Sequence, residues 1–342
     1  MKALYCPVWG KLEITNLPRP QLTDGEVLIR VSNCGICGSE LETFRANSLR
    51  RTPPLIMGHE FCGQIEEVRG PKLNWTEGQR VIAHALIHCG QCTVCLRGDT
   101  NLCVNRQVFG MHRPGAFAEY VAVPQRVLIP WPEGIPGTTA VFAEPLANGI
   151  NAMRQSPTAR KSRVVVIGAG PIGLMCVFAA KQLYRSSIVV SDLVPERLAA
   201  AQAVGADKTV NVALQDLAHE TQEYWSGNAP EFVIDAVGSG KTKVQSLELV
   251  ESGGTVVWIG LHEDRLQLNS YAVTLGQKCV TGSYSGSFQD FQQAADLLAS
   301  KTMDTSWATQ YPLEKGEIGF RDMLLGKEDK IKAILDLNGH LS

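Results

Sequence analysis

The sequence has no long apolar run. None of its hydrophobic stretches approaches the roughly 20 residues of a membrane-spanning helix. The N-terminal segment MKALYCPVWGKLEITN has no apolar core of the kind that a secretory signal peptide carries. These two absences predict a cytoplasmic protein that does not enter a membrane.

An excess of charge is also missing. The chain has 32 Lys and Arg residues against 34 Asp and Glu residues, a net charge of -2 over 342 residues. This balance produces no field that attracts nucleic acid or an anionic membrane. The expected partners are small molecules and other subunits.

The length and the cysteine usage argue against a small disulfide-bonded scaffold. Ten cysteines in a short secreted chain would predict disulfide bonds, but this chain has 342 residues, and four of its cysteines lie at metal-ligand spacing. Metal thiolates are the better prediction. A chain of this length also exceeds what one hydrophobic core usually fills, so we expect two domains.

The most specific signal lies at 163–192, where the chain reads RVVVIGAGPIGLMCVFAAKQLYRSSIVVSD. An apolar strand runs directly into a GxGxxG motif, and a helical pattern follows. The glycines permit a tight turn, the close approach of a pyrophosphate and close packing of the helix, whose N-terminus favours phosphate. The predicted cofactor-binding residues of this loop are Gly168, Gly170, Pro171, Ile172 and Gly173.

A carboxylate follows the loop at the distance that is typical of an NAD site. A second β-rich run, 187–190, leads to Asp192, which lies 19 residues past Gly173 and can accept from both hydroxyls of an adenosine ribose. A 2′-phosphate would be repelled there, so the sequence favours NAD over NADP. Arg197, in the PERL turn that follows, would help to bind a 2′-phosphate if Asp192 were replaced.

The character of the sequence changes near residue 149. Before it, short β-like runs at 27–31, 59–68, 80–83 and 116–123 alternate with glycine and proline and show no long helical period, which predicts a mostly β domain, a partly closed barrel. After it, strand and helix signals alternate, as in a doubly wound parallel sheet. The six expected strands lie near Val164, Ile188, Thr209, Phe232, Val256 and Val280.

The tail of the chain returns to mixed signals. From residue 287 it predicts a helix over FQDFQQAADLLAS, a strand-like piece, a short helix and a closing strand at 332–337. We assign this tail to the first domain. The predicted α/β fold therefore has a mostly β domain at 1–148 and 287–342 and a Rossmann NAD-binding domain at 149–286.

The segment 88–103, HCGQCTVCLRGDTNLC, places four cysteines at spacings that suit structural zinc. Four thiolates close a tetrahedral site and leave no open position. A ferredoxin-type iron–sulfur cluster also begins with two CxxC steps, but its fourth cysteine normally follows after three residues and precedes proline, which is not the case here. A nucleic-acid-binding knuckle would need basic and aromatic neighbours that the segment lacks. The four predicted ligands are Cys89, Cys92, Cys95 and Cys103.

A second metal candidate is dispersed over CGICGSE at 34–40, GHE at 58–60 and AEPL at 143–146. It offers one sulfur, one imidazole and two carboxylates, a mixed set that suits catalytic zinc with a position left for water or substrate. Each side chain alone is more commonly a buried structural group than a metal ligand. The four candidates are Cys37, His59, Glu60 and Glu144.

Further motifs join these: the chain reads GQRV at 78–81 and GAFAEY at 115–120. Together with GHE, the four-cysteine segment, EPL and GAGPIG, they resemble the zinc-containing medium-chain dehydrogenase/reductase family, from Leu4 to Leu337. The chain is most similar to the branch of sorbitol, threonine and sugar-alcohol-phosphate dehydrogenases, because glutamate stands in EPL where liver-type alcohol dehydrogenases carry cysteine.

The resemblance implies a GroES-like catalytic domain with zinc on Cys37 and His59, and with Glu60 and Glu144 as direct or water-mediated ligands. Ser39 matches the family hydroxyl that contacts the substrate alcohol. Zinc would lower the pKa of a secondary hydroxyl, Ser39 would relay its proton, and hydride would pass to NAD. The implied activity is reversible oxidation of a secondary alcohol, such as a polyol, by a homodimer or homotetramer with two zinc ions per chain.

Two positions depart from the family pattern. Many relatives carry aspartate where this chain has Glu40 and histidine where it has Glu42. The aspartate normally supports the zinc-bound histidine, and the longer Glu40 is expected to reach differently. Glu42 is either a proton relay or a solvated loop residue.

Two alternatives to a zinc enzyme stay open from the sequence. A non-catalytic dinucleotide-binding or sensor protein would keep 168–192 but lose zinc ligands, and a zinc-free quinone reductase of the same superfamily would lack Cys37, His59 and the cysteine segment. All these residues are present. The polar residues Arg45, His112 and Arg113 in loops hint at a polyhydroxylated ligand, although most such side chains are solvated surface groups.

Overall fold

The protein is described by a computed structural model that covers residues 1–46, 49–71, 74–156, 161–326 and 330–337. It divides into two compact units, Met1–Glu144 with Ser287–Ser342, and Pro145–Gly286. We call them the first and the second unit and describe each by itself. Helix α4 (Ala143–Arg154) crosses the boundary between them.

The first unit is built mainly from β-strands around β3. This ten-residue strand pairs with β5 along its length, with β9 through 26–30 and with β18 through 33–35. The largest sheet has the order β10-β6-β5-β3-β18-β17, and two smaller sheets have the orders β2-β1-β4 and β7-β8. The strands are β1 Lys2–Cys6, β2 Glu13–Asn16, β3 Glu26–Gly35, β4 Leu55–Ile56, β5 Glu60–Val68, β6 Arg80–Ala83, β7 Leu86–Ile87, β8 Gln107–Val108, β9 Tyr120–Pro124, β10 Leu128–Pro130, β17 Ala308–Pro312 and β18 Lys332–Asp336.

The core of the first unit lies between these strands and contains fully buried aromatic side chains. The rings of Phe61 and Phe109 meet edge to face with centroids 5.4 Å apart, and Phe117 is also fully buried. Alternation of half-buried and exposed residues is visible in strands such as β2, which is the pattern expected where one face of a sheet meets water. The predicted mostly β domain is therefore present.

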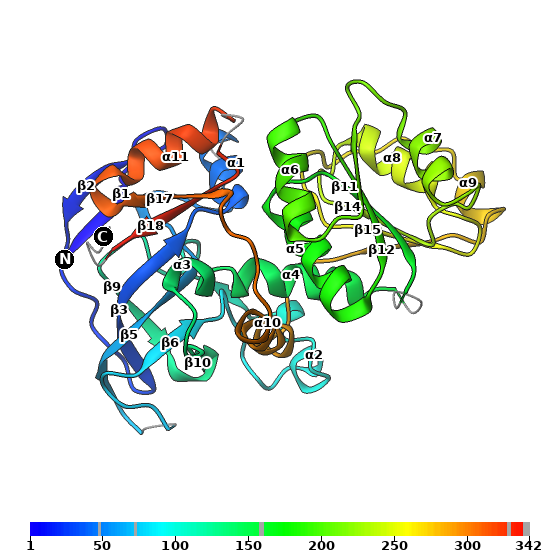
Figure 1. Ribbon diagram of the computed structural model, residues 1–342. Helices are drawn as coiled ribbons and strands as arrows, with labels where there is room; N and C mark the ends of the chain where they lie inside the picture. Colours follow the sequence, from blue (N-terminus) through cyan, green and yellow to red (C-terminus); the bar gives the residue numbers. More distant parts are fainter. Residues whose placement is uncertain (47–48, 72–73, 157–160, 327–329, 338–342) are drawn as a thin grey trace. The chain divides into compact units, whose positions relative to one another are not determined.

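Helices of the first unit lie at the ends and on the surface of its sheets, and Figure 1 shows α11 lying across β17 and β18. Helix α10 matches the expected FQDFQQAADLLAS helix. It begins after Ser287 because Ser287 and Asp290 form a capping box there. Helix α1 was not expected, since the sequence shows no helical period there. The helices are α1 Gly38–Ala46, α2 Thr93–Leu96, α3 Gly137–Ala140, α10 Phe288–Ser300 and α11 Gly316–Leu324.

The second unit contains one parallel sheet of six strands with the order β13-β12-β11-β14-β15-β16. Numbered along the chain, this is the doubly wound order 3-2-1-4-5-6. All six expected strands are present. They are β11 Arg163–Ile167, β12 Ser187–Asp192, β13 Lys208–Asn211, β14 Phe232–Asp235, β15 Thr255–Trp258 and β16 Cys279–Gly282.

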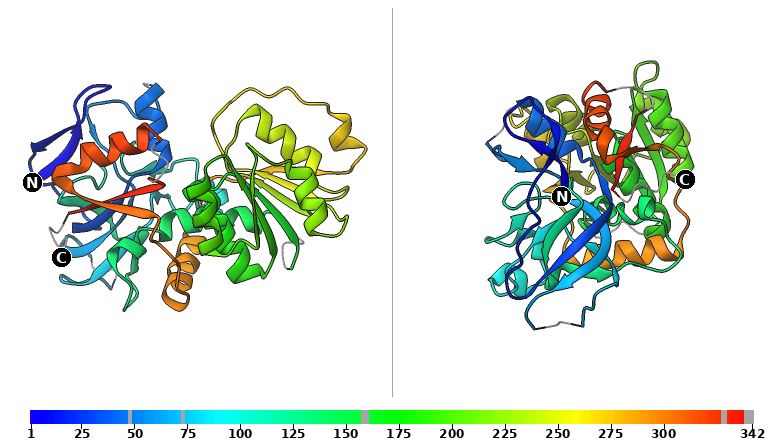
Figure 2. Two further views of the ribbon diagram at one scale, coloured as in Figure 1. Left: turned by 45° about the horizontal axis from the view of Figure 1, so that its top comes forward. Right: turned by 90° about the vertical axis from the view of Figure 1, so that its left-hand side faces the viewer.

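Helices cover both faces of this parallel sheet, as the left view of Figure 2 shows. Its central strands are therefore continuous apolar runs, and β11 and β14 are buried almost throughout. The edge strand β16 is partly exposed. The helices are α5 Pro171–Ala179, α6 Pro195–Val204, α7 Leu217–Tyr224, α8 Gly240–Leu249 and α9 Tyr271–Thr274, and a π-helical turn, η3 Ala180–Tyr184, continues α5.

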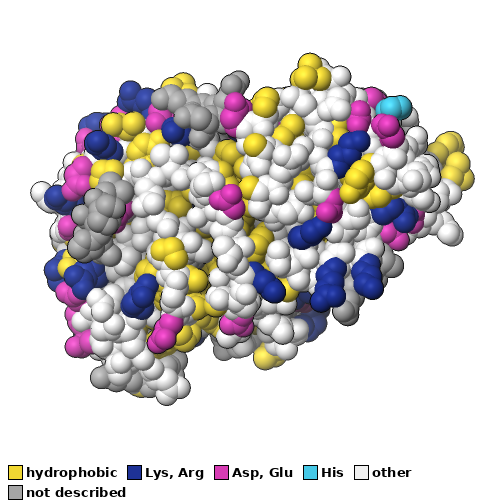
Figure 3. Space-filling model, in the orientation of Figure 1, with side chains coloured by type: hydrophobic (Ala, Val, Ile, Leu, Met, Phe, Trp, Pro, Cys, Tyr) yellow, Lys and Arg dark blue, Asp and Glu magenta, His cyan; other side chains and the backbone are white. Residues whose placement is uncertain are grey.

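Charges of both signs are interspersed on the face shown in Figure 3, as the balanced composition leads one to expect. Among the described residues, none of the helices combines the length and the apolar composition of a membrane span.

Candidate functional site

The four cysteines of the segment 88–103 come together in the first unit. The sulfur atoms of Cys89, Cys92, Cys95 and Cys103 all lie within 4.8 Å of one another. Cys92 Sγ is 3.4 Å from Cys95 Sγ and 3.9 Å from Cys103 Sγ. Sulfur atoms bound to one tetrahedral zinc at about 2.3 Å are about 3.8 Å apart. The arrangement therefore fits a four-thiolate zinc site.

Local backbone geometry prepares part of this cluster to hold charge. Backbone N–H groups of Gln91 and Cys92 lower the pKa of Cys89 to about 6, whereas burial raises the pKa of Cys95 to about 12. All ten cysteines of the chain are free thiols. Four sulfur atoms at this separation repel one another once ionised, so the cluster requires a cation to be stable as thiolates.

Cys37, His59 and Glu60 form a second group, with one ligand atom of each within 4.8 Å of the others. The pairing of Gly35 in β3 with Glu60 in β5 brings the CGIC turn beside the GHE turn. His59 and Glu60 are buried, whereas Cys37 is partly exposed. The structure thus assembles three of the four predicted side chains of the dispersed metal candidate.

His59 is held in place by Glu40. The Nδ1 atom of His59 lies 3.0 Å from Glu40 Oε1, which also accepts from the Gly58 N–H, while Glu40 Oε2 accepts from the Cys37 N–H. Nε2 is therefore the ring nitrogen left for a metal. Burial lowers the pKa of His59, but Glu40 and Cys37 outweigh it and hold that pKa well above the ordinary value. The raised pKa keeps a proton on Nε2, and a metal cation bound at Nε2 would replace that proton.

Lys332 of β18 pairs with Glu60 behind the group, and both side chains are 1% exposed. Burial lowers the pKa of Lys332, but Glu60, Cys37 and Glu144 outweigh it and raise that pKa. Lys332 contacts Glu60 through Oε2, and a carboxylate with one such contact retains capacity for a metal. Glu144, buried at the start of α4, lies outside the close group but within electrostatic range of Lys332.

Ser39 stands at the exposed side of the group, on the first turn of α1. Its hydroxyl donates to Cys37 Sγ at 3.3 Å and accepts from Arg51 Nη2 at 3.1 Å. Arg51 was missed by sequence reasoning, because it lies in a polar stretch beside another arginine and belongs to no motif. A signal for Lys332 did exist, since a lysine opens the otherwise apolar strand KAILD.

The glycine-rich loop of the second unit has the geometry of a dinucleotide site. Gly168 has a φ of +95°, and a Cβ on Gly173 would lie 1.9 Å from the Gly168 carbonyl oxygen, so both positions require glycine. A Cβ on Gly170 would meet no atom of the described chain within 4 Å. The missing side chain at Gly170 therefore leaves open space at the N-terminus of α5, where a pyrophosphate fits.

Asp192 ends β12 beside this loop. Its Oδ2 accepts from the Ala169 N–H at 2.7 Å, and its Oδ1 accepts from the Leu193 and Val194 N–H groups. Each carboxylate oxygen has two lone pairs, so Oδ2 retains capacity to accept a ribose hydroxyl. Arg197 lies on the first turn of α6 and is half-buried.

The polar loop residues that hinted at a substrate are otherwise engaged. Arg113 donates to Glu26 at 2.5 Å, His112 Nδ1 accepts from the Val108 N–H, and Arg45 donates to the Leu324 carbonyl. Glu42 is exposed on α1. None of these contacts points to a substrate.

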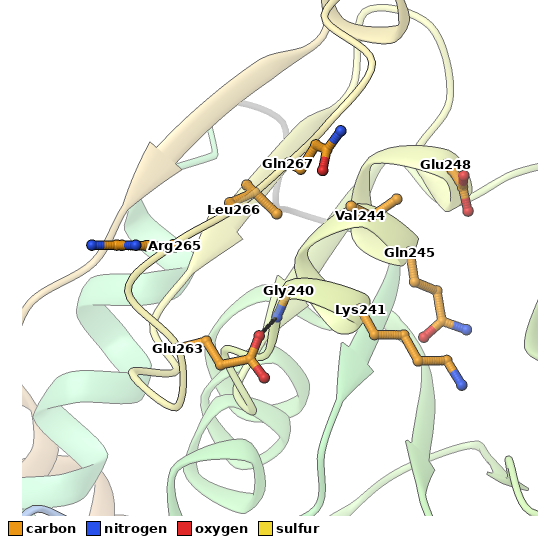
Figure 4. Close-up of a pocket in the computed structure, with 9 residues that line it drawn as sticks. All are labelled: Gly240, Lys241, Val244, Gln245, Glu248, Glu263, Arg265, Leu266 and Gln267. Atoms are coloured by element: carbon orange, nitrogen blue, oxygen red, sulfur yellow. Dashed lines mark hydrogen bonds between the residues drawn. The ribbon is translucent and has the colours of Figure 1, made fainter.

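A hollow of about 560 Å³ lies in the second unit, between α8 and the segment 263–267. Figure 4 shows the residues that line it. Glu263 accepts from the Gly240 N–H at 2.6 Å and so caps the helix start itself. None of the residues that line this hollow is a predicted site residue. We assign no function to it.

Two family models match the chain. The model described as alcohol dehydrogenase GroES-like domain matches residues 23–133, and the model described as zinc-binding dehydrogenase matches residues 171–300. The first covers the CGIC and GHE turns and the cysteine segment, and the second begins inside the glycine-rich loop.

Curated relatives and solved structures agree with these matches. D-arabitol-phosphate dehydrogenase of Enterococcus avium is 30% identical over 95% of this chain and 94% of its own, and L-threonine 3-dehydrogenase of Pyrococcus furiosus is 34% identical over 77% and 76%. A short chain alcohol dehydrogenase from Escherichia coli CFT073, complexed with NADH, has a TM-score of 0.91 and 26% identity, covering 98% of this chain and 99% of its own.

A protein from Sinorhizobium meliloti 1021, described as a zinc-binding dehydrogenase and bound to NADP, has a TM-score of 0.90 and 27% identity over 98% of this chain and 99% of its own. The predicted resemblance and the predicted GroES-like and Rossmann fold are thereby confirmed. The chain belongs to the zinc-binding alcohol dehydrogenase family, in its medium-chain polyol dehydrogenase branch, and is an oxidoreductase.

Proposed function

We propose that the protein oxidises a secondary alcohol of a polyol, sugar alcohol or related hydroxy compound to a ketone, reversibly, with NAD as hydride acceptor and a zinc ion at Cys37 and His59. The observation that carries this proposal is the group of Cys37, His59 and Glu60, of which the last two are buried. It holds a sulfur and an imidazole nitrogen close together with one side left accessible, as catalytic zinc requires.

The charges around this group favour a divalent cation. A bound zinc would take the place of the Cys37 thiol proton and of the His59 Nε2 proton. The side chains of Glu40, Glu60, Glu144 and Cys37 would then carry four negative charges against the two positive charges of Arg51 and Lys332, and such an excess at buried positions is costly unless the metal offsets it. One zinc ion bound there would neutralise the excess.

Each residue then has a defined task. Cys37 Sγ and His59 Nε2 bind the metal, Glu40 holds the imidazole, and Glu60 and Glu144 act as ligands directly or through water. Zinc, when bound, polarises an alcohol oxygen and makes its proton easier to remove. Ser39, partly exposed beside Cys37, accepts a hydrogen bond from the substrate hydroxyl and so orients it.

Zinc analysis and an activity panel test this proposal together. Freshly purified protein should contain two zinc ions per chain, one on Cys37 and His59 and one on the four cysteines. Cys37→Ser and His59→Ala should abolish turnover and remove one zinc while NADH binding persists. One zinc or none in active wild-type protein would contradict the proposal.

We propose NAD rather than NADP as the cofactor. The glycine-rich loop binds the pyrophosphate through Gly168, Gly170, Pro171, Ile172 and Gly173, and Asp192 accepts from the adenosine ribose. A negative charge at Asp192 repels a 2′-phosphate, and the backbone N–H groups that donate to this carboxylate do not neutralise it. A wild-type protein with equal kcat/KM for NAD and NADP would disprove this assignment, and Asp192→Ser should shift the ratio toward NADP with help from Arg197.

The substrate class follows the relatives, which include dehydrogenases named for arabitol phosphate and threonine. A panel of polyols, sugar phosphates, 3-hydroxy amino acids and simple alcohols, followed through NADH absorbance, identifies the substrate. Oxidation of primary alcohols only would overturn the proposed preference for a secondary hydroxyl.

We also propose a homodimer or homotetramer. In the second unit, β16 ends the sheet as a partly exposed edge strand, and Tyr271 and Leu275 nearby in sequence are 77% and 82% exposed. An open strand edge with apolar neighbours is suited to pairing with another copy. Sedimentation of the purified protein measures the state.

A reducing compartment, the cytoplasm, is the proposed location. Ten free cysteines, four of them at a metal-ligand cluster, are typical of proteins that stay reduced. Trapping of thiols in intact cells, followed by mass spectrometry of the protein, should find all ten reduced or metal-bound.

A further inference from the structure

Arg51 is 2% exposed, yet none of the ion pairs among the described residues includes it. Its guanidinium makes four hydrogen bonds to oxygen atoms. Nε donates to the Gly110 carbonyl at 3.1 Å, Nη1 donates to the Ser39 carbonyl at 2.8 Å and to Thr43 Oγ1 at 3.0 Å, and Nη2 donates to Ser39 Oγ at 3.1 Å. Two of the four bonds go to one residue, Ser39.

A buried guanidinium is an expensive group, so its position requires an explanation. Its charge acts on Glu40, whose pKa it helps to lower together with His59 against the effect of burial. A neutral side chain would suffice to fill the space. What Arg51 adds is a planar guanidinium with several N–H donors at fixed angles to one another. Such a group fixes the direction of the hydrogen bonds that its acceptors receive.

The fork restricts what the Ser39 hydroxyl can do. A hydroxyl has one proton and two lone pairs. One lone pair accepts from Arg51 Nη2, and the proton points to Cys37 Sγ at 3.3 Å. A single lone pair is left, and the side chain is partly exposed.

From this geometry we infer that Arg51 is a positioning residue, which turns the Ser39 hydroxyl so that its remaining lone pair accepts the hydrogen bond of the substrate alcohol. The inference rests on the proposed function, in which Ser39 meets the substrate. Arg51 itself touches no reacting atom. It acts only through Ser39, and its effect on turnover should disappear when the Ser39 hydroxyl is removed.

A double-mutant cycle between Arg51→Lys and Ser39→Ala tests this dependence. Lysine keeps the charge but lacks the fork, so kcat per bound zinc should fall on the order of 10- to 100-fold, because a hydroxyl turned away from the substrate loses its contribution. KM should change by about 3-fold or less. In the Ser39→Ala background, Arg51→Lys should lower kcat by less than about 2-fold. The probe is the panel alcohol with the largest kcat/KM for wild type.

Thr43→Val is the matched control. Thr43 accepts from the same guanidinium and donates to the Ser39 carbonyl at 2.6 Å, but it does not touch the Ser39 hydroxyl. Its kcat per zinc should stay within about 2-fold of wild type. A loss for Thr43→Val as large as for Arg51→Lys would assign the effect to the structure of α1 and overturn the inference.

If the Arg51→Lys variant does not fold, the same cycle is measured with Arg51→Gln, whose amide keeps N–H donors but carries no charge. A second readout needs no turnover: in metal-free protein, urea unfolding of the same four proteins should show a coupling between positions 39 and 51 of about 5-fold in the unfolding equilibrium constant. Equal losses of kcat on replacing Arg51 in the wild-type and in the Ser39→Ala background would overturn the inference. If wild type oxidises no panel alcohol, the proposed function fails first, and the inference fails with it.

Discussion

Glu40 and Glu42 stand two positions apart on α1, and their environments are opposite. Glu40 is fully buried and accepts from His59, the Gly58 N–H and the Cys37 N–H. Glu42 is exposed, and the hydrogen bonds and ion pairs between described residues do not include it. A proton relay needs a proton-accepting group held near the reacting atoms, and the exposure of Glu42 favours its alternative role as a solvated residue. We therefore propose Ser39 as the group beside the substrate hydroxyl.

Replacing each glutamate by glutamine separates the two roles. Glu40→Gln keeps the shape but removes the charge that orients His59 and faces Arg51, so zinc affinity should fall about 10- to 100-fold. Glu42→Gln should leave zinc affinity and kcat within about 2-fold of wild type. Chelator competition and steady-state kinetics measure both. A loss of kcat in Glu42→Gln at full zinc content would restore the relay.

Glu26 forms an ion pair with Arg113, a residue that the sequence suggested as a substrate contact. The charge of Arg113 therefore has a structural role. Arg113 and the Thr23 N–H hold the Glu26 carboxylate, and although burial opposes ionisation, these contacts lower its pKa. A lowered pKa in the folded state stabilises the fold above the unfolded value of about 4.3, and this stability is lost as pH falls through the folded pKa.

Glu26→Gln should therefore destabilise the protein by on the order of 1 to 3 kcal/mol near pH 7. The difference from wild type should begin to shrink as pH falls below the unfolded value of about 4.3, and should continue to shrink as pH falls through the lowered pKa of the folded state. Urea unfolding at several pH values measures it. A difference that stays constant down to about pH 3 would mean that the charge of Glu26 contributes nothing.

At the scale of an element, the β11 strand, glycine-rich loop and α5 offer two glycines with different requirements. A Cβ on Gly173 would lie 1.9 Å from the Gly168 carbonyl oxygen, whereas a Cβ on Gly170 would meet nothing within 4 Å. Gly173→Ala should lower the melting temperature and the yield of folded protein. Gly170→Ala should keep the melting temperature of the free protein and weaken NADH binding about 10-fold or more, because the methyl group fills the space of a phosphate.

Thermal unfolding and fluorescence titration with NADH distinguish the two glycine variants. Equal NADH affinity for Gly170→Ala and wild type would show that the open space at Gly170 is not the pyrophosphate site.

The cysteine segment is the second element with a sharp expectation. Cys95→Ser should reduce bound zinc from about two to about one per chain and lower the melting temperature, because structural zinc contributes folding free energy. Chelators should then have a smaller effect on the variant than on wild type. Cys279→Ser, at an exposed cysteine outside both groups, is the control and should retain two zinc ions. Two zinc ions in Cys95→Ser would contradict the assignment.

Elements of this chain were predictable where local sequence and tertiary structure agree. Helix α10 follows from its capping box and amphipathic period, and β11 follows from an apolar run that ends at glycine. Helix α1 was missed because its buried face contains Glu40 and Thr43, whose burial depends on Arg51 and His59 rather than on an apolar stripe.

The site was predictable where it rests on motifs. The GHE and CGIC turns and the cysteine segment can be read along the chain, but Arg51 and Lys332 act through contacts that only the fold creates. Lys332 contacts Glu60 although 272 positions separate them. No local pattern could have paired them.

At the scale of the whole molecule, the metal group of the first unit depends on both ends of the chain. Strand β18 pairs antiparallel with the end of β3 and delivers Lys332 to Glu60. The parallel sheet of the second unit is inserted between these segments in the sequence. The contact between Lys332 and Glu60 therefore joins two segments of the first unit that the whole second unit separates in the sequence.

At the scale of the assembly, β16 is the edge strand at one end of the parallel sheet. Its outer row of N–H groups has no strand partner among the described residues of the second unit. The Cys279 and Ser283 N–H groups donate inward, to Gly254 and Trp258. Alternation along a strand then points the Val280 N–H outward and the Thr281 N–H inward.

Val280→Pro removes an outward donor and keeps the inward ladder, which an edge strand tolerates. If two copies pair through β16, a two-fold interface loses this bond twice, and association should weaken on the order of 10- to 30-fold. Sedimentation velocity over a dilution series measures the shift toward the monomer. Thr281→Pro, the control, breaks the inward ladder and should lower the melting temperature instead. An unchanged dissociation constant for folded Val280→Pro would place the subunit interface elsewhere on the molecule.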